Sequence, residues 1–336
     1  MEYPVKACVY RPGAKLIMKK LRLLMTTLVA LPALAGAQNY PNKPVRMVVG
    51  FAAGGAPDIL ARLIAQPFNE RLRQPLVVDN RPGAASTIGA DIVAHAPKDG
   101  YTLLMATVSL AISPSVYPQL TLRVPEDFAA VSMVASVPLI LVVFPGLPAK
   151  TMPDLIRLMK ERPGQYNYAS VGGGSLQHLA AELFKLKTGT QMTHVPYKGG
   201  APANTALLAG EAQVYFSGMP PALPLVQAGR LRALAVTSTA RVAAVPDVPT
   251  MAEAGLPGSE ADNWHAVIAP RDVPADVVKR LNETLMSILA DSALQKQFAA
   301  QGAQARSSTP QALQLFVRQE VEKWRGVARA ANIQLQ

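Results

Sequence analysis

Short apolar runs alternate with longer amphipathic patterns along most of this chain, and this alternation limits its fold more than any other feature. Apolar runs of strand length predict strands at 45–51, 76–80, 101–107, 139–144, 213–217 and 232–238. Amphipathic patterns predict helices at 58–73, 86–96, 153–161, 175–187, 202–209, 275–290 and 310–330. Continuous apolar strands between helices are typical of sheets covered on both faces. The sequence therefore predicts an α/β protein with parallel strands.

Clusters of proline and glycine punctuate the middle of the chain, where they predict loops rather than helices or strands. They lie at 145–148, 162–164, 220–224 and 246–258.

Residues 15–38 have the three parts of a secretory signal peptide. Basic residues at 15–22 precede an apolar run over 23–34, and the small residues 35-AGA-37 follow. The apolar run is too short to cross a bilayer as a permanent helix. A start at Met18 gives a signal of ordinary length, and we expect cleavage after Ala37. Residues 1–37 are then a leader and the mature chain is periplasmic; the alternative is a buried N-terminal helix.

The composition argues against a nucleic-acid or metal-binding protein. Part of the formal net charge of +11 belongs to the predicted leader, and the other basic residues form no run. The only cysteine, Cys8, also lies in the leader, so the mature chain depends on core packing for stability. The four histidines are scattered without metal-ligand spacing, so neither a metal nor a cofactor is expected.

The stretch 51-FAAGGAPDILAR-62 predicts a strand, a glycine turn and a helix. Gly54 and Gly55 allow a ligand oxygen to approach the main chain, and Pro57 suits the first helical turn. Free N–H groups at a helix start favour an anion. Asp58 has two readings: it complements the helix N-terminus, or it accepts a hydrogen bond from a ligand.

The same arrangement recurs at 170-SVGGGSLQHL-179, where three glycines and Ser175 precede an amphipathic helix. Two helix starts of this kind could hold one anion from both sides. A third candidate is 81-RPGAASTIG-89, through its backbone and hydroxyl groups. Thr107 and Ser109 follow a predicted strand, where open α/β sheets place ligands. Tyr197 offers an aromatic wall with a hydroxyl and Lys198 offers a cation. Phe216, Ser217 and Gly218 follow a predicted strand and could form the floor of the pocket.

Nucleotide binding and serine hydrolysis are poorly supported by the motifs. The glycine clusters match neither the dinucleotide fingerprint nor the P-loop. The stretch 173-GGSLQ-177 lacks the last glycine of a nucleophile elbow, although a secreted hydrolase using Ser175 remains an alternative. His178 lies three residues after Ser175 and is better suited to anchor the helix than to act as a catalytic base.

Several stretches together, in order along the chain, resemble the Bug-type extracytoplasmic solute receptors of tripartite tricarboxylate transport systems. They are FAAGGAPDILAR, 80-NRPGAASTIGADIVAHAPKDGYTLLMAT-107, 166-YNYASVGGGSLQHLAAELFK-185, 194-HVPYKGGAPA-203, 229-GRLRALAVTS-238, 248-VPTMAEAGLPG-258 and the segment of Trp264. The resemblance covers nearly the whole mature chain. It departs from the family at Ala52 and Ala53, where prolines are usual, and at Ser217 and Gly218, where many relatives have an acidic residue.

The resemblance implies a periplasmic binding protein of two α/β lobes, with a ligand cleft between lobes joined by two crossover strands. It implies lobe 1 from residues 38–141 with 265–336 and lobe 2 from residues 142–264. A small carboxylate (a dicarboxylate, amino acid or aromatic acid) is the implied ligand, membrane transporter components are the implied partners, and a monomer without catalytic activity is expected. A carboxylate sensor for a signalling partner is an alternative.

Residue chemistry and resemblance together predict one set of ligand-binding residues. It comprises Phe51, Ala53, Gly54, Gly55, Asp58, Ala84, Ala85, Ser86, Thr87, Thr107, Ser109, Ser170, Gly172, Gly173, Ser175, His178, Tyr197, Lys198, Phe216 and Ser217.

Overall fold

The computed structural model describes residues 1–5 and 40–330. The predicted signal peptide, the predicted start and cleavage positions and Cys8 lie outside these residues. The chain divides into two units, Met1–Tyr40 and Pro41–Gln336, and the helices and strands below belong to the second. Within the described residues, every helix is too short or too polar to cross a membrane.

The strands form one mixed sheet in the order β2-β1-β3-β9-β4-β7-β5-β6, and β8 and β10 also pair with β4. The strands are β1 (Val45–Val49), β2 (Leu76–Asn80), β3 (Thr102–Thr107), β4 (Phe128–Val143), β5 (Asn167–Ser170), β6 (Thr193–Pro196), β7 (Val214–Gly218), β8 (Arg232–Val236), β9 (Asp262–Pro270) and β10 (Gln304–Ala305). Strands β1, β2 and β3 are parallel to one another, as are β5, β6 and β7.

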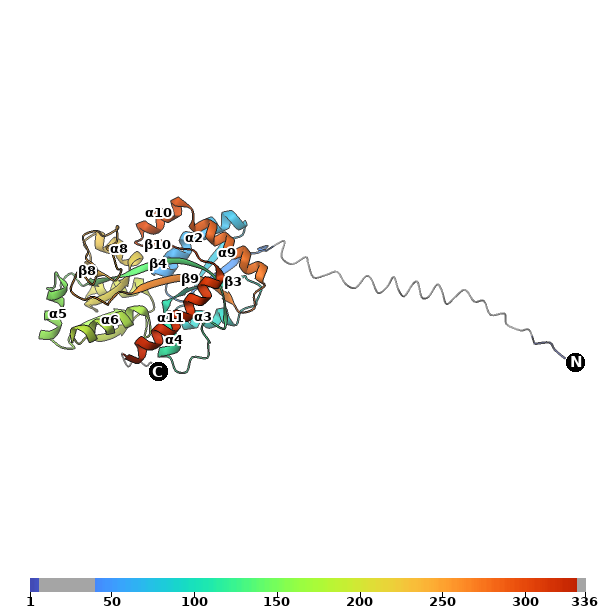
Figure 1. The fold of residues 1–336 in the computed structure, drawn as a ribbon, viewed down its shortest axis with the longest axis horizontal. Coiled ribbons are helices and arrows are strands. Elements are labelled where there is room, and N and C mark those ends of the chain that lie inside the picture. The colour runs from blue at the N-terminus through green and yellow to red at the C-terminus, as the bar shows by residue number, and fades with distance from the viewer. Residues whose placement is uncertain (6–39, 331–336) are drawn as a thin grey trace. The chain divides into compact units, whose positions relative to one another are not determined.

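The two long central strands correct the prediction of parallel sheets, because β4 and β9 are antiparallel to their neighbours. Residues 128–138 of β4 pair with β9, whereas residues 139–143 pair with β7 and β8. One strand therefore joins the two parallel groups, with β9 beside its first part (Figure 1). Strand–helix alternation specifies direction only where a crossover helix joins neighbours in the sheet, and β4 and β9 have none.

Helices follow most of the strands. They are α2 (Ala56–Leu72), α3 (Thr87–Ala94), α4 (Val108–Val116), α5 (Met152–Glu161), α6 (Leu176–Thr188), α7 (Gly200–Ala209), α8 (Met219–Gln227), α9 (Ala275–Leu289), α10 (Ser292–Ala300) and α11 (Pro310–Ala330), with a short 3₁₀ turn, η1, at Ala84–Ser86. The helices predicted from periodicity all form, with ends shifted by at most two residues, and α11 has its predicted span.

Helix α8 shows that the loop predicted at 220–224 is wrong. Pro220 and Pro221 lie in the first turn of this helix, where the missing N–H groups would have no helical partner in any case. Helices α4 and α10 and strands β5, β6, β9 and β10 were not predicted, and α4 also contains a proline, Pro114. Short elements with internal proline carry too little periodicity to be recognised.

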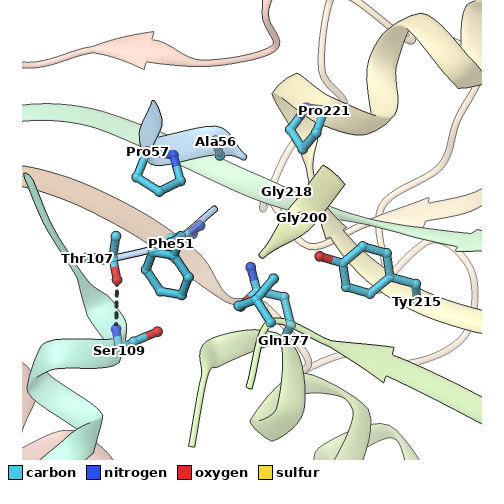
Figure 2. Close-up of a pocket in the computed structure, with 12 residues that line it drawn as sticks. Phe51, Ala56, Pro57, Thr107, Ser109, Gln177, Gly200, Tyr215, Gly218 and Pro221 are labelled. Atoms are coloured by element: carbon cyan, nitrogen blue, oxygen red, sulfur yellow. Dashed lines mark hydrogen bonds between the residues drawn. The ribbon is translucent and has the colours of Figure 1, made fainter. Parts of the chain in front are cut away.

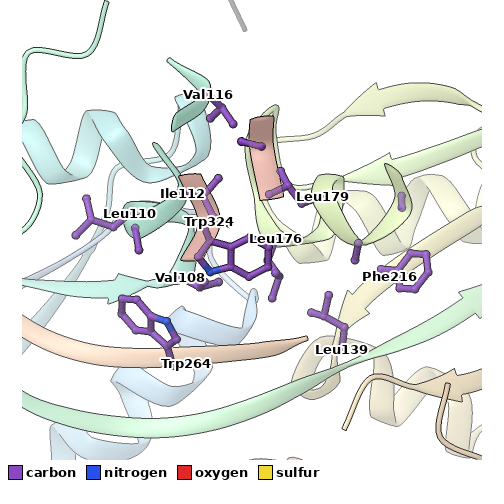
Figure 3. Close-up of a cluster of buried hydrophobic side chains, with 14 of the residues drawn as sticks. Val108, Leu110, Ile112, Val116, Leu139, Leu176, Leu179, Phe216, Trp264 and Trp324 are labelled. Carbon is purple, nitrogen blue, oxygen red and sulfur yellow. The ribbon is translucent and has the colours of Figure 1, made fainter. Parts of the chain in front are cut away.

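Two tryptophans from distant segments share one buried carboxylate in the hydrophobic core. The indole N–H groups of Trp264 in β9 and Trp324 in α11 each donate a hydrogen bond of 3.0 Å to Glu320 Oε2. All three side chains are buried, and Figure 3 shows both indoles within the apolar cluster that includes Val108 and Leu110. Trp264 is therefore a core residue.

Replacing Glu320 by alanine is expected to lower the free energy of unfolding by about 3 kcal/mol, because two buried N–H groups lose a charged acceptor. Urea denaturation followed by tryptophan fluorescence measures this change. Glu322→Ala is the matched control, because Glu322 forms only an exposed ion pair with Arg325, and a change below about 0.5 kcal/mol is expected there. Equal effects of the two substitutions would contradict the core role of Glu320.

Candidate ligand-binding site

Within the described residues, five helices begin around one pocket, each directly beyond the carboxyl end of a parallel strand. Helices α2, α4, α6, α7 and α8 follow β1, β3, β5, β6 and β7. This is the edge at which open α/β sheets bind ligands. Each helix start turns the positive end of its dipole toward the pocket, and all but α8, whose first turn contains Pro220 and Pro221, also offer several N–H groups. The pocket is lined by Phe51, Ala56, Pro57, Thr107, Ser109, Val171, Gln177, Gly200, Tyr215, Gly218, Pro221 and Asn263 (Figure 2).

The lining of this pocket is uncharged and the pocket is narrow. Its polar groups come from hydroxyls, from the amides of Gln177 and Asn263 and from the main chain. About 20 Å³ is open to the centres of water-sized molecules, which is room for roughly one water. The positive potential in this pocket therefore comes from helix ends and not from lysine or arginine.

The glycine turn before α2 is held by Asp58. Gly54 has φ +75°, which favours glycine, and its N–H donates to Asp58 Oδ2 at 2.9 Å. Arg62 donates to both oxygens of the same carboxylate at 3.1 Å. Burial raises the pKa of Asp58, but the hydrogen bonds from Arg62 and Gly54 outweigh burial and lower it. The carboxylate of Asp58 therefore stabilises the glycine turn through hydrogen bonds within the protein.

The turn before α2 also touches the turn before α7. Ala52 N–H donates to Lys198 O at 3.0 Å, and a Cβ added to Gly199 would lie 2.9 Å from Ala52 N. Glycine is required at position 199 because the two main chains approach this closely. Ala53 and Lys198 are exposed and Tyr197 is half-buried, and none of the three lines the pocket.

The glycine loop before α6 is supported by Ser175 and His178. Ser175 caps α6: its Oγ accepts the His178 backbone N–H at 3.3 Å and donates to Gly172 O at 2.7 Å. His178 Nδ1 accepts the Gly174 N–H at 3.1 Å. Among the hydrogen bonds of the described residues, none joins the His178 ring to Ser175 Oγ, which is the contact a serine hydrolase needs.

Behind this loop, two histidine rings stack with Tyr168. The centroids of His178 and His194 lie 4.2 Å apart, and those of His194 and Tyr168 lie 4.9 Å apart. Ser170 Oγ lies 2.6 Å from His194 Nε2, and the Gly172 N–H donates to Ser170 Oγ at 3.1 Å. Burial lowers the pKa of both histidines, that of His194 to about 4. Ser170 and His178 therefore position the loop from behind.

The third predicted segment, 84–87, lies against the glycine loop before α6. Ala84, Ala85 and Ser86 all have positive φ, and a Cβ at Gly172 would lie 3.3 Å from Ala85 N. Thr87 Oγ1 donates to Ala84 O at 2.8 Å, whereas Ser86 Oγ is buried without a hydrogen-bond partner. The segment stands next to the pocket but does not line it.

Of the predicted residues, Phe51, Thr107 and Ser109 line the pocket, and the Thr107 hydroxyl caps α4 by accepting Ser109 N–H at 3.3 Å. Gly54 and Gly55 directly precede the lining residue Ala56. Gly173 borders the loop before α6, and its carbonyl accepts from the Tyr117 hydroxyl at 2.5 Å. Phe216 packs against Phe184 with centroids 6.0 Å apart, and its neighbour Tyr215 lines the pocket. Ser217 donates to Asn204 Oδ1.

The sequence did not point to eight of the lining residues, whereas Gly218, predicted as part of the pocket floor, does line the pocket. The eight are Ala56, Pro57, Val171, Gln177, Gly200, Tyr215, Pro221 and Asn263. Gln177 could have been found, since it is the second residue of a helix whose start was predicted to face the ligand. Asn263 gave no signal, because it lies in β9, which was not among the predicted strands.

A larger groove lies elsewhere in the same unit, with about 970 Å³ open to water-sized molecules. It is lined by residues 237–244 and 260–262 and by parts of α10, β10 and α11, and it contains the side chains of Arg241, Arg306 and Lys323. Helix starts do not converge on it, and its cations Arg241 and Lys323 already pair with Glu253 and Glu320. The narrow pocket is thus the better candidate for an anion.

Among the residues that the structure describes, no three histidine, cysteine, aspartate or glutamate side chains are grouped closely enough to hold a metal ion.

The fold and the pocket define the class of protein, a periplasmic binding protein of mixed α/β fold. Residues 60–333 match the model of the tripartite tricarboxylate transporter family receptor, TctC. The chain is 40% identical to BugT of Bordetella pertussis over 301 residues, which cover 89% of this chain and 92% of BugT. It belongs to this receptor family, which confirms the resemblance seen in the sequence.

Solved structures agree with this assignment. The periplasmic binding protein BugD is 33% identical, with a TM-score of 0.86 over 88% of this chain and 100% of BugD. An R. palustris protein solved with adipate is 38% identical, with a TM-score of 0.85 over 88% of this chain and 100% of that one. MatC from Rhodopseudomonas palustris, solved with bound malate, is 30% identical, with a TM-score of 0.82 over 86% and 99%.

Proposed function

We propose that this receptor binds a small carboxylate in the pocket formed by the five helix starts and delivers it to the membrane components of a tripartite tricarboxylate transporter. The observation that carries the proposal is the convergence of helices α2, α4, α6, α7 and α8 on an uncharged pocket. Backbone N–H groups and helix dipoles stabilise an anion without a counter-charge. Adipate and malate, bound by two relatives, are ligands of this kind.

The contacts to the ligand in this proposal come from main-chain N–H groups at the helix starts and from four side chains, Thr107, Ser109, Gln177 and Asn263. Four other predicted residues stabilise the ligand-binding turns without contacting the ligand in this proposal. Asp58 and Ser175 bond to the turns before α2 and α6, and Ser170 and His178 bond to the glycine loop before α6. This division is supported by the hydrogen bonds that these side chains already make. No catalytic step is proposed, since Ser175 caps a helix and lacks an imidazole partner.

Two lobes that close on the ligand are part of the proposal, with lobe 1 from residues 38–141 and 265–336 and lobe 2 from residues 142–264. The change of partners along β4 at Leu139, from β9 to β7, supports a boundary near the predicted one. Because the pocket has room for roughly one water molecule, a carboxylate enters only if the lobes separate. Closure is a hinge motion, in which the ligand favours the closed state by its contacts there.

The predicted export signal places the mature chain in the periplasm in this proposal. Family members are periplasmic binding proteins, and the mature chain is proposed to reach the periplasm through cleavage after Ala37. A monomer is proposed, since one chain contains the whole pocket.

Calorimetry against adipate, malate and succinate, with nucleotides and sugars as controls, tests the proposed function. At least one acid is expected to bind and to stabilise the protein by about 2.7 kcal/mol at one hundred times its dissociation constant. A nucleotide or sugar that binds while every acid fails would overturn the carboxylate proposal.

A further inference from the structure

Among the pocket-lining residues that the structure describes, Tyr215 alone has a buried side-chain polar atom without a hydrogen-bond partner. It lies on β7, its side chain is 0% exposed, and its hydroxyl has no hydrogen-bond partner within the described residues. Figure 2 shows this hydroxyl pointing toward Gly200 and Gln177, and a Cβ built on Gly200 would lie 3.8 Å from it. A buried hydroxyl without a partner destabilises the folded protein, so its presence calls for an explanation.

The surroundings of Tyr215 leave its hydroxyl free for a ligand. Ser217, two residues further along β7, lies near the tyrosine hydroxyl but directs its own proton to Asn204 Oδ1 at 3.2 Å. Asn204 Nδ2 is itself buried without a partner. Burial raises the pKa of Tyr215, so the hydroxyl keeps its proton and is a donor. The Tyr215 hydroxyl and Asn204 Nδ2 are thus both buried donors without a partner among the described residues.

A positively charged group would be poorly tolerated in the same pocket. Every side chain that lines it is uncharged, and five helix starts give it a positive potential. The carboxylate of Asp58, at the start of α2, is already bonded to Gly54 and Arg62. An ammonium group on a ligand would thus be desolvated without a counter-charge, which costs several kcal/mol.

We infer that Tyr215 is a specificity-determining residue: its hydroxyl donates to an acceptor oxygen of the ligand, distinct from the carboxylate at the helix starts, and the pocket selects against ligands that carry an ammonium group. The inference rests on the proposed function and narrows it. The selected ligands are acids with a hydroxyl, a carbonyl or a second carboxylate, and amino acids are excluded.

Matched acids that differ in one substituent test the selection. Succinate, malate and aspartate share a four-carbon skeleton and carry hydrogen, hydroxyl or ammonium at the same position; glutarate, 2-hydroxyglutarate and glutamate form a five-carbon set. In whichever set binds, the amino acid is expected to bind at least about 30-fold more weakly than the hydroxy acid, as measured by calorimetry. An amino acid that binds equally well overturns this inference and leaves the proposed function standing. Failure of all six acids, with adipate, overturns both.

Tyr215→Phe isolates the hydroxyl, because it keeps the ring and removes only the oxygen. We expect affinity for the best acid to fall about 10-fold while the melting temperature stays the same or rises, since the lost group had no partner in the protein. Tyr166→Phe, at a tyrosine outside the pocket lining, is the control and should leave affinity unchanged. Unchanged affinity in Tyr215→Phe would contradict the assigned role.

Gln177→Glu tests the charge argument from the opposite direction. It places a carboxylate of nearly the same shape in the pocket lining. The ratio of amino-acid to hydroxy-acid affinity is expected to rise at least 10-fold, because the new carboxylate compensates an ammonium group and repels an anion. A ratio that does not move would show that lining charge does not set the selection.

Discussion

Replacement of Gly55 by valine is expected to lower carboxylate affinity at least about 100-fold while the protein retains a cooperative unfolding transition. Gly55 is the N-cap of α2 and has φ −80°, a conformation open to any residue, so the substitution adds no backbone strain. A Cβ at this position would lie 3.4 Å from Ala52 O and 3.6 Å from Gly200 N. The two valine methyl groups beyond it must then occupy the narrow space between the starts of α2 and α7.

Affinity by calorimetry and stability by urea denaturation separate a blocked site from a damaged fold. Gly326→Val is the matched control, because a Cβ at Gly326 in α11 meets no atom within 4 Å. The control is expected to bind as the parent protein does. Undiminished affinity in Gly55→Val would mean that the ligand does not approach the start of α2, and the pocket would have to be reassigned.

Stability is expected to fall by several kcal/mol as the pH is lowered from about 6.5 to about 4. Burial lowers the pKa of His265 to about 4, and burial together with the neighbouring His178 lowers that of His194 to about 4. Both histidines are neutral in the folded protein and take up protons on unfolding. Since the folded pKa values are depressed, the stabilisation is complete above the unfolded pKa of about 6.5 and is lost on acidification, by on the order of 3 kcal/mol per histidine.

His265→Leu isolates one of these two effects. The ring of His265 is 0% exposed and both its nitrogens lack a hydrogen-bond partner among the described residues, so leucine should preserve or raise stability at pH 7. Urea denaturation between pH 4 and pH 8 is expected to show a markedly smaller acid loss in this variant. His95→Asn, at an exposed histidine, should retain the parent slope. A parent-like slope in His265→Leu would show that protonation of His265 does not cause the acid loss.

The long helices could be predicted from the sequence, because a helix cap and an apolar helix face depend only on residues close together in the chain. The stretch 310–330 has a cap at Thr309, whose hydroxyl accepts Ala312 N–H at 3.2 Å, and apolar side chains on one face, and α11 spans those residues. The ordered motifs also indicated the receptor family. The prolines of α8, in contrast, predict a loop, since the sequence does not say whether a proline begins a helix or breaks one.

The candidate site was predicted in outline but not in its side chains. The glycine-rich turns before α2 and α6 do border the pocket, because strand, glycine turn and helix follow one another in the chain. Gln177, Tyr215 and Asn263 were missed, because each lines the pocket only through its position relative to distant segments. Asp58 and Ser175 were predicted as ligand contacts, whereas both already bond to nearby main-chain groups.

The sequence by itself determined the α/β class, most helices, the glycine turns and the family, since periodicity, caps and ordered motifs are properties of neighbouring residues. Only the tertiary structure decided that β4 and β9 run antiparallel through the sheet, that five helix starts converge on one pocket and that the Tyr215 hydroxyl is left without a partner. Strand pairing and hydrogen-bond satisfaction depend on residues far apart in the chain, and such distances are fixed only when the whole chain packs.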